Sequence, residues 1–518
     1  MKHSLPDTDL TVSTAAGAVR GTEIGAGAGG GDRAGADGGV RTWRGIPYAA
    51  PPVGPLRFRG PQPVAPWTSV RAATRFGDAP PQLVRSRNVG AGRHPVSEDC
   101  LTINVTAPAK PGPEPLPVIV CLYGGGFLIG SSAAPVYGGG RLVAAGGVVY
   151  VSLNYRVGAL GFLDLTSYAD ESHPFESNVG LRDQLAGLRW VRDNIAAFGG
   201  DPENVTLVGQ SAGGTSVLTL MAVPPAAGLF HRAVALSPAP ASVYGSERHA
   251  AWARTFVRTL GIDDEDAARA LTHLPWRELV GALDKLSPWL GRAVNRDPMP
   301  ASPVVDGDFL PRRVIDAFQT GTAHRVPLIV GSTAREGALF RYLNALPTSP
   351  QRIEQSILQS EPDAWDRIRA GYPRFPRRDA VIDMVGDGIF WHPGVQIAQA
   401  HSRFAPVWSY RYDFDTPALR LAGLGATHGT DLPALFGELE TDTGRFFTLL
   451  GGREEAARLS ARYQGALLDF ARHGDPGGGW PTYDDVARRV RIFDTEDRIE
   501  SDPRRGRRLA WGDYRGFL

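Results

Sequence analysis

The sequence predicts an α/β fold with a mostly parallel central sheet, and three observations lead to that prediction. Short apolar, β-branched runs end in glycines at residues 117–126 and 205–214. Such runs are typical of strands that are buried on both faces of a parallel sheet. Before the second run, residues 178–200 carry apolar side chains at helical spacing and end in two glycines, which indicates a helix. The apolar run at residues 148–156, this helix and the run at residues 205–214 follow one another as strand, helix and strand, an order typical of the βαβ unit.

Further strands and two long insertions are expected around this unit. Apolar strand-like runs occur at residues 148–156, 326–333 and 407–414. Long segments of mostly helical pattern, around residues 240–320 and 342–388, suit cap-like insertions that help to build a pocket over the strand ends. We find no linker that divides the chain, and we therefore expect a single domain over residues 1–518. The glycine-rich segment 25–39 is expected to be a flexible hairpin loop.

Composition excludes several classes of protein. The 518 residues are 42% hydrophobic and carry a formal net charge of +1, without the strong basic field of a nucleic-acid binder. Two cysteines are few, as is usual in a reducing compartment. The N-terminus lacks an apolar signal region, and no run of 18 apolar residues occurs. We expect a cytoplasmic protein without a membrane span, and the arginine-rich, lysine-poor composition is typical of GC-rich bacterial coding.

A Gly-x-Ser-x-Gly motif, GQSAG at residues 209–213, lies at the end of the second of the glycine-ended runs. A helix-forming stretch comes next, so the motif lies at the strand-to-helix turn that a nucleophile elbow requires. Glycines keep this turn tight and leave the hydroxyl of Ser211 exposed, and the helix start directs its positive end at a developing oxyanion. A phosphate-binding turn is disfavoured, because the segment has neither the P-loop lysine nor G-x-G-x-x-G spacing. We therefore predict Ser211 as a nucleophile.

A second glycine motif, YGGGF at residues 123–127, also follows a buried strand. Its glycines expose backbone N–H groups and allow a carbonyl to approach closely. Standing alone, the motif would be a plain glycine turn. Together with GQSAG it predicts an oxyanion hole for acyl transfer, formed by the N–H groups of Gly125, Gly126 and Ala212.

Several ordered motifs resemble the type B carboxylesterase/lipase family, which includes bacterial p-nitrobenzyl esterases and, more distantly, the cholinesterases. The serine signature of that family is matched by FGGDPENVTLVGQSAGG at residues 198–214. The segment SEDCLTINV at residues 97–105 resembles its second signature, and GIPYAAPPVGPLRFRGPQPVAPW at residues 45–67 resembles its N-terminal block. The resemblance is dense in the N-terminal half and recurs in islands afterwards. It implies an α/β-hydrolase fold.

The resemblance also implies a Ser-Glu-His triad in that chain order. The segment REGALF at residues 335–340 resembles the acid motif of the family and assigns Glu336 as the acid. The segment GATHGTDLPALFG at residues 425–437 resembles the histidine motif and assigns His428 as the base. Ser237 resembles the serine that supports the acid in relatives. From the residues alone, Glu336 would pass for a surface carboxylate, and His428 stands out only by its glycine-flanked loop.

Other expectations drawn from the resemblance concern the pocket and two departures from the family pattern. The resemblance suggests an aromatic pocket, although ordinary core packing suits such residues equally well. The candidate pocket walls are Phe127, Phe340, Phe390 and Trp391. Pro80 stands where relatives have the cysteine that bridges to the one in the SEDC motif, so Cys100 is expected to be unpaired. Arg335 stands where the family usually has aspartate.

These features predict a serine carboxylesterase that hydrolyses uncharged, small-to-medium carboxylic esters through an acyl-enzyme on Ser211. No metal and no organic cofactor is required, and the oligomeric state is left open between monomer and dimer. An acyltransferase that uses the same acyl-enzyme is an alternative, and amidase activity is a weaker one. A non-catalytic, neuroligin-like binding protein is disfavoured, because such relatives lack the serine and carry a membrane span.

Overall fold

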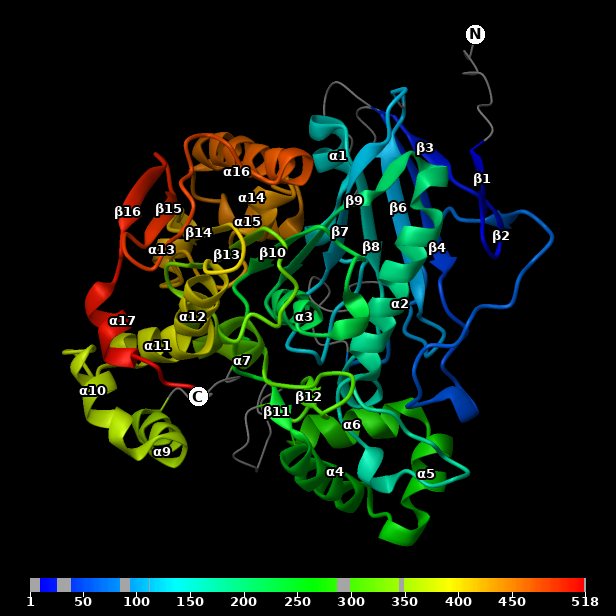
Figure 1. Cartoon of the computed structure of the whole chain (residues 1–518), viewed down its shortest axis with the longest axis horizontal. Coiled ribbons are helices and arrows are strands. Elements are labelled where there is room, and N and C mark those ends of the chain that lie inside the picture. The colour runs from blue at the N-terminus through cyan, green and yellow to red at the C-terminus, as the bar shows by residue number, and fades with distance from the viewer. Residues whose placement is uncertain are drawn as a thin grey trace.

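The computed structural model describes residues 10–25, 39–83, 94–110, 112–286, 299–343 and 349–516. Within them, an eleven-stranded sheet forms the centre of the molecule (Figure 1). Across the sheet, the strands are β16 (Arg498–Ser501), β15 (Arg489–Phe493), β14 (Val407–Tyr412), β13 (Leu328–Thr333), β10 (Arg232–Leu236), β9 (Gly200–Gln210), β7 (Leu116–Leu122), β8 (Val149–Leu153), β6 (Thr102–Pro108), β4 (Val40–Pro47) and β3 (Thr22–Ile24).

The sheet is parallel through its middle and antiparallel at both edges. Neighbouring strands from β15 to β8 pair in parallel. The outer pairs β16–β15, β8–β6, β6–β4 and β4–β3 are antiparallel. The predicted mostly parallel α/β sheet is thus confirmed. Because parallel strands all end at one edge, the residues that follow β7, β9 and β13 lie at the same edge of the sheet.

Most of the predicted strands are present, but the sequence missed one at the centre. The five expected runs correspond to β7, β8, β9, β13 and β14. Between β9 and β13 the sequence suggested mostly helix, whereas β10 (sequence RAVAL) lies between those two strands and pairs with both. A five-residue run with two alanines does not distinguish a buried strand from a helix segment, so only the pairing with two neighbours determines its conformation.

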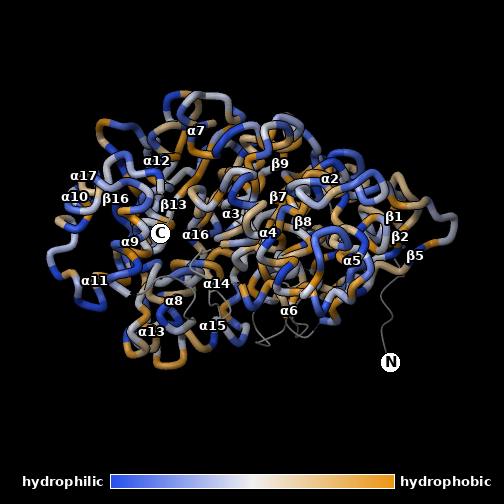
Figure 2. The backbone as a smooth tube through the Cα atoms, turned by 90° about the horizontal axis from the view of Figure 1, so that it is seen from below, coloured by the Kyte–Doolittle hydropathy of each residue, from blue (hydrophilic) through white to orange (hydrophobic). Residues whose placement is uncertain are grey.

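Helices cover both faces of the sheet, whose central strands are buried along most of their length. Helix α3 (Ala212–Met221) packs on β7, β9 and β10, and α12 (His392–His401) packs on β13 and β14. Helix α16 (Arg453–His473) packs on β7 and β9, and contacts α1 (Gly140–Gly146). The predicted crossover helix is α2 (Val179–Asn194), which buries Leu181, Leu185, Leu188 and Val191 on one side. In Figure 2, hydrophilic stretches run around much of the periphery.

The two predicted insertions consist largely of helices. The first contains α4 (Ser246–Leu260), α5 (Ala267–His273) and α6 (Trp276–Leu286), which group at the lower end of Figure 1. The second contains α9 (Pro350–Ser360), α10 (Trp365–Ala370) and α11 (Arg378–Gly386), followed by the π-helical turn η11 (Asp387–Trp391). The C-terminal helix α17 (Arg505–Trp511) packs on α10. The second insertion and α17 share a separate hydrophobic cluster that includes Trp365, Tyr372 and Trp511.

Small elements complete the described chain. A three-stranded sheet and a two-stranded sheet lie outside the main sheet, and several short helices connect the larger elements. These elements are β1 (Thr11–Thr14), β2 (Gly17–Arg20), β5 (Arg71–Ala72), β11 (Tyr244–Gly245), β12 (Val304–Val305), α7 (Val314–Gln319), α8 (Phe340–Leu343), α13 (Pro417–Leu421), α14 (Leu432–Leu435) and α15 (Asp442–Phe447). None of the helices that the structure describes is both long and apolar enough to cross a membrane.

Two paired strands flank the predicted glycine-rich loop. Strands β3 and β4 are antiparallel, with Ile24 opposite Val40. The body of the predicted loop, residues 26–38, lies outside the described residues.

A buried ion pair joins the end of β8 to α2. Both side chains are almost fully buried, and Arg156 Nη2 lies 2.7 Å from Asp183 Oδ1. The same carboxylate accepts hydrogen bonds from Arg156 Nε at 2.8 Å and from the Arg156 backbone N–H at 3.0 Å. Removing one member of such a pair leaves the other as an uncompensated buried charge.

We expect Arg156→Met to lower the free energy of unfolding by about 3–5 kcal/mol, because Asp183 would lose its buried partner. Denaturant and thermal unfolding would measure the loss. The matched control is Arg192→Met, which removes an exposed arginine from its pair with Asp193 and is expected to cost about 1 kcal/mol or less. Equal losses in the two variants would contradict a special role for the buried pair.

Candidate active site

Ser211 lies at the edge of the sheet, between β9 and α3. Its backbone has φ 58° and ψ −123°, an unfavourable conformation for a residue with a side chain. Its N–H donates to the carbonyl of Leu236 at 2.8 Å. The side chain is 6% exposed. The predicted strand–serine–helix turn is therefore present in the structure.

Close packing explains the two glycines that flank this serine. A Cβ on Gly209 would lie 2.3 Å from the carbonyl oxygen of Gly213. A Cβ on Gly213 would lie 2.1 Å from the carbonyl oxygen of Leu122, at the end of β7. Both contacts are with backbone atoms, which have little room to move. The motif brings the turn after β9 against the end of β7, next to the glycine loop.

The glycine loop presents backbone donors beside Ser211. Gly125 and Gly126 have positive φ angles of 128° and 62°, and Gly126 and Ala212 line the same pocket as Ser211. Among the described residues, no protein acceptor bonds the N–H of Gly125, Gly126 or Ala212. Nearby, the N–H of Gly124 donates to the hydroxyl of Tyr137 at 2.8 Å, which holds the loop. Three N–H groups thus remain available to a ligand oxygen.

Glu336 and His428 form a buried pair at the same edge of the sheet. Glu336 begins the short turn η9 (Glu336–Ala338) after β13 and is 3% exposed. Its Oε2 lies 2.5 Å from His428 Nδ1. Its Oε1 accepts hydrogen bonds from the Ser237 hydroxyl and from the Thr333 N–H, both at 2.6 Å. Three donors therefore hold one carboxylate in a fixed orientation.

The hydrogen bonds of His428 indicate its tautomer. A carboxylate only accepts, so the proton between Glu336 and His428 is placed on Nδ1. Nε2 is then an acceptor, and Gln210 Nε2 lies 3.2 Å from it. Among the described hydrogen bonds, none joins Ser211 Oγ to His428. The sequence analysis had not singled out Gln210, although it is the variable residue of the GQSAG motif.

A narrow pocket opens beside Ser211. Its enclosed space is about 10 Å³, close to the room that one water molecule needs. Two of the four predicted aromatic walls, Phe127 and Phe390, line it. The sequence analysis had not singled out the other side chains of the lining. They are Thr215, Ala239, Ser242, Met299 and Ile389.

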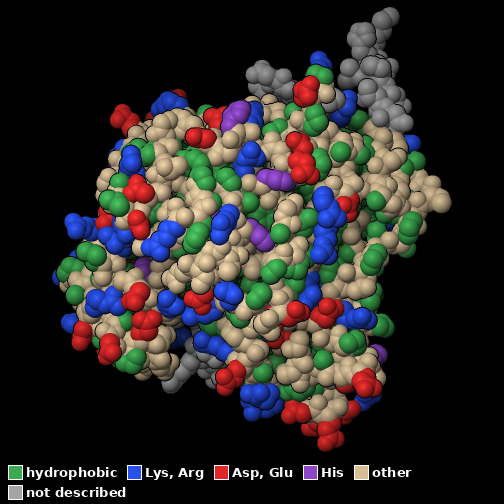
Figure 3. Space-filling model, viewed as in Figure 1, with side chains coloured by type: hydrophobic (Ala, Val, Ile, Leu, Met, Phe, Trp, Pro, Cys, Tyr) green, Lys and Arg blue, Asp and Glu red, His purple; other side chains and the backbone are tan. Residues whose placement is uncertain are grey.

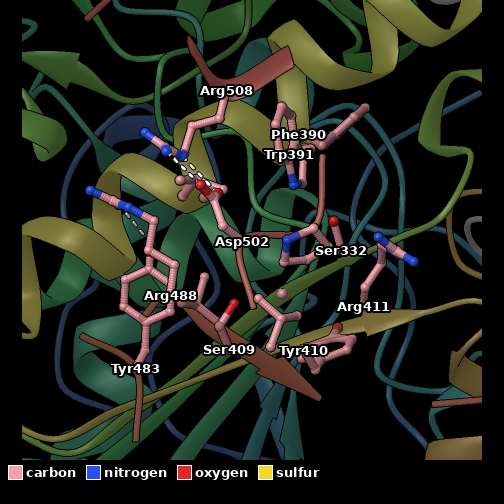
Figure 4. A pocket seen from close by; sticks show the side chains of 16 residues that line it. Ser332, Phe390, Trp391, Ser409, Tyr410, Arg411, Tyr483, Arg488, Asp502 and Arg508 are labelled. Atoms are coloured by element: carbon pink, nitrogen blue, oxygen red, sulfur yellow. Dashed lines mark hydrogen bonds and ion pairs between the residues drawn. The ribbon is translucent and has the colours of Figure 1, made fainter. Parts of the chain in front are cut away.

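The other two predicted aromatics do not line this pocket. Phe340 stacks on Phe390 with a centroid distance of 5.6 Å and lies 5.2 Å from the His428 ring. Trp391 lines a separate crevice, together with Phe390 and the ion pair of Asp502 and Arg508 (Figure 4). Phe340 thus packs against Phe390 and the imidazole ring, whereas Trp391 lies in the crevice that Asp502 and Arg508 also line.

A buried carboxylate that the sequence analysis did not identify lies close to the imidazole. Asp431 follows His428 by three residues and is fully buried. Its Oδ2 accepts a hydrogen bond from the Tyr410 hydroxyl at 3.2 Å, whereas Oδ1 has no partner among the described residues. Burial raises the pKa of Asp431 to about 6, and the nearby Glu336 carboxylate adds to this effect while His428 opposes it.

A parallel sheet that presents a serine on a tight turn, at the edge where an imidazole and a carboxylate pair, is typical of the α/β-hydrolases. Within the described residues, no cluster of three His, Cys, Asp or Glu side chains could hold a metal ion. The chain belongs to the carboxylesterase family, whose model matches residues 8–508. It is a carboxylic ester hydrolase, and the serine acyl-enzyme mechanism is general to this family.

Individual relatives agree with this assignment. The chain is 36% identical over 502 residues to a para-nitrobenzyl esterase of Bacillus subtilis, covering 96% of this chain and 97% of the relative. It is 35% identical to a phenmedipham hydrolase of Pseudarthrobacter oxydans, covering 86% of this chain and 90% of that protein. A solved structure of a thermophilic PNB esterase matches with a TM-score of 0.84 and 35% identity, over 97% of this chain and all of that one.

We expect Asp431→Asn to stabilise the protein increasingly as pH rises from about 4 to about 7. The pKa of the Asp431 carboxyl is near 3.8 in the unfolded chain and about 6 in the folded protein. Above pH 3.8 the unfolded chain therefore ionises more readily than the folded protein, which lowers the free energy of unfolding. The cost above pH 6 is about 3 kcal/mol, and asparagine removes it. Thermal unfolding of both proteins between pH 4 and pH 8 would measure the difference.

The matched control for this experiment is Asp193→Asn, at an exposed carboxylate of α2. Its effect should not follow the same pH range. A gain from Asp431→Asn that was constant across pH would show that the charge of Asp431 is not the cause.

Proposed function

We propose that this protein hydrolyses small-to-medium, uncharged carboxylic esters, with Ser211 as nucleophile, His428 as general base and Glu336 as the acid that orients the imidazole. The observation that carries this proposal is the Glu336–His428 contact of 2.5 Å at the sheet edge where the strained turn presents Ser211. Such a pair keeps the proton on Nδ1 and leaves the Nε2 lone pair available to accept one from the serine.

The reaction takes place in two halves. Ser211 Oγ attacks the ester carbonyl while its proton passes to His428 Nε2, and the N–H groups of Gly125, Gly126 and Ala212 stabilise the oxyanion. His428 then protonates the leaving alcohol as the ester C–O bond breaks, which leaves an acyl-enzyme. Water repeats the sequence, releases the acid and regenerates Ser211. Because Gln210 donates to Nε2 in the free protein, the imidazole exchanges this partner for Ser211 when catalysis begins.

The shape of the pocket supports a short acyl group. Among the described residues, its lining beside Ser211 is mostly apolar and carries no charged side chain, so a charged acyl group would lose its hydration there without compensation. The space of about 10 Å³ admits a long chain only if the walls move. The name of a relative, para-nitrobenzyl esterase, supports a substrate whose alcohol part can be aromatic.

We further propose that residues 1–518 form one catalytic domain and that the two helical insertions act as its cap. This is supported by the sheet, to which segments between Thr22 and Ser501 contribute strands. A reducing, cytoplasmic location is also proposed. Its support is that Cys100 and Cys121 are both buried free thiols, and that burial raises the pKa of each well above its usual value.

A panel of p-nitrophenyl esters from acetate to palmitate tests the proposed chemistry and the acyl pocket together. We expect the highest kcat/KM with acetate to butyrate, because the pocket is narrow. Ser211→Ala, Glu336→Gln and His428→Ala should each lose several orders of magnitude in kcat, since the triad acts as a unit. Equal inactivity of the wild type and Ser211→Ala on every ester would contradict the esterase proposal. Near-normal turnover in Glu336→Gln or His428→Ala would show that the substituted residue is not a member of the triad.

A second prediction concerns the support of the acid. Ser237→Ala removes one of the three donors to Glu336, and we expect kcat to fall about tenfold with little change in KM, because the bond is to a charged group. Ser460→Ala is the matched control, since its buried hydroxyl donates to the neutral carbonyl of Ala434 at 2.6 Å. Equal kcat values for the two variants would show that Ser237 does not position Glu336.

A further inference from the structure

Four arginines line an open groove on the far side of the turn that carries Glu336. The groove lies between α10, α11 and α17 and encloses about 780 Å³. We call it the arginine groove and define it by Arg335, Arg367, Arg504 and Arg507. Its other lining residues are one acid, Asp383, and uncharged residues. These uncharged residues are Ala370, Gly371, Pro373, Gly506, Leu509 and Ala510.

Two of the arginines are held by carboxylates beneath the groove. The buried carboxylate of Asp387 accepts from Arg504 Nη1 and from Arg507 Nη1, both at 2.8 Å. Arg507 Nη2 also donates to Asp383 at 3.0 Å. These contacts fix both guanidinium groups as part of the structure, and their side chains are only 17% and 28% exposed.

The other two arginines are less neutralised. The guanidinium of Arg335 makes no hydrogen bond within the described residues, and its nearest carboxylate, Asp383, lies at 3.8 Å. Arg367 donates to the carbonyl of Ala510 at 2.7 Å. Its nearest carboxylate is that of Asp513, at 4.0 Å, and this aspartate is 94% exposed. An exposed ion pair of this kind contributes about 1 kcal/mol or less.

The groove therefore carries an excess of positive charge. Within the described residues, four guanidinium groups pair with three carboxylates, those of Asp383, Asp387 and the exposed Asp513. Arginine and acidic side chains alternate over the lower left of the molecule, where α10 and α17 lie (Figure 3). Within the groove itself the arginines predominate. The planar fork of an arginine matches the oxygens of phosphate and carboxylate groups, and the partly buried setting reduces screening.

We propose that the arginine groove is a binding site for a small multivalent anion of the organic phosphate or polycarboxylate class. Arg335 and Arg367 contact its oxyanions directly, Arg504 and Arg507 form a fixed, charge-paired floor beneath them, and Leu509 provides an apolar contact for the rest of the molecule. The site is separate from the ester pocket, because the two linings share no residue.

The location of the groove gives this site a connection to the catalytic machinery. Arg335 directly precedes Glu336, and α11, which carries Asp383, packs on the turn η9 that begins with Glu336. A Cβ on Gly337 would lie 2.1 Å from the carbonyl oxygen of Ile382, so this contact is tight. An anion held by Arg335 thus contacts the residue next to Glu336, beside the packing of α11 on η9 that positions this acid.

Isothermal titration of the full-length protein with pyrophosphate and with citrate, at constant ionic strength set by sodium chloride, tests the proposal. We expect saturable binding of at least one of the two with a stoichiometry of one. Pyrophosphate and citrate distinguish the phosphate class from the polycarboxylate class. The double variant Arg335→Gln and Arg367→Gln should weaken binding at least tenfold, since each lost charge-assisted contact is worth about tenfold in affinity.

The matched control is Arg403→Gln with Arg489→Gln, which removes the same charge from two surface arginines that each pair with one aspartate. Its affinity should stay within about twofold of wild type. A second variant, Leu509→Glu, adds a negative charge at a side chain that is 55% exposed, so it keeps the fold and should also weaken binding. Leu421→Glu, at an 80% exposed leucine, is its control.

Three results would overturn the proposal. The first is no saturable binding of either anion to the wild type, and the second is an equal loss of affinity in the groove variants and their controls. The third is loss of binding in Ser211→Ala, which would place the anion in the ester pocket. Retained binding in Ser211→Ala supports the groove. Because this titration requires no ester turnover, its failure is distinguishable from failure of the proposed hydrolysis.

Discussion

Parallel pairing of β7, β9, β10 and β13 is the constraint on which the rest of the structure depends. The pairing register places Gly209 beside Leu122 of β7 and beside Ala235 of β10. The turn after β9 can then pack against the end of β7 only if its flanking residues are glycine. The acid follows β13, next to β10, so the same edge receives every proposed catalytic group. Loops at such an edge can vary in length without moving the strands that hold them.

Buried carboxylates are the second theme of this fold, and the chain compensates each of them differently. Glu336 has three donors and lies against an imidazole. Asp183 and Asp387 are held by guanidinium groups. Within the described residues, Asp431 accepts a hydrogen bond from the Tyr410 hydroxyl, and burial raises its pKa to about 6. Burial raises the pKa of Asp183 as well, although Arg156 opposes this effect, so donors reduce the cost of a buried carboxylate without removing it.

Much of the fold and most of the candidate site could be predicted from local sequence. The runs around β7, β9 and β13 carry a strong buried-strand pattern, and GQSAG has a steric reason for each glycine. By contrast, β10 has only five residues, and its conformation depends on two neighbours that are distant in sequence. The assignment of Glu336 and His428 depended on the family resemblance. No local sequence pattern shows that two residues 92 positions apart will form a hydrogen bond.

The sequence by itself determined the class of sheet, the serine turn, the glycine loop and membership of the carboxylesterase family, since each depends on residues that are close along the chain. The tertiary structure decided the contacts between distant segments. It placed Phe390 in the ester pocket and Trp391 in another crevice, brought Gln210 to the imidazole, and assembled the arginine groove from the turn after β13 and from α10, α11 and α17. Close packing and charge compensation are properties of neighbours in space, and a linear pattern does not record them.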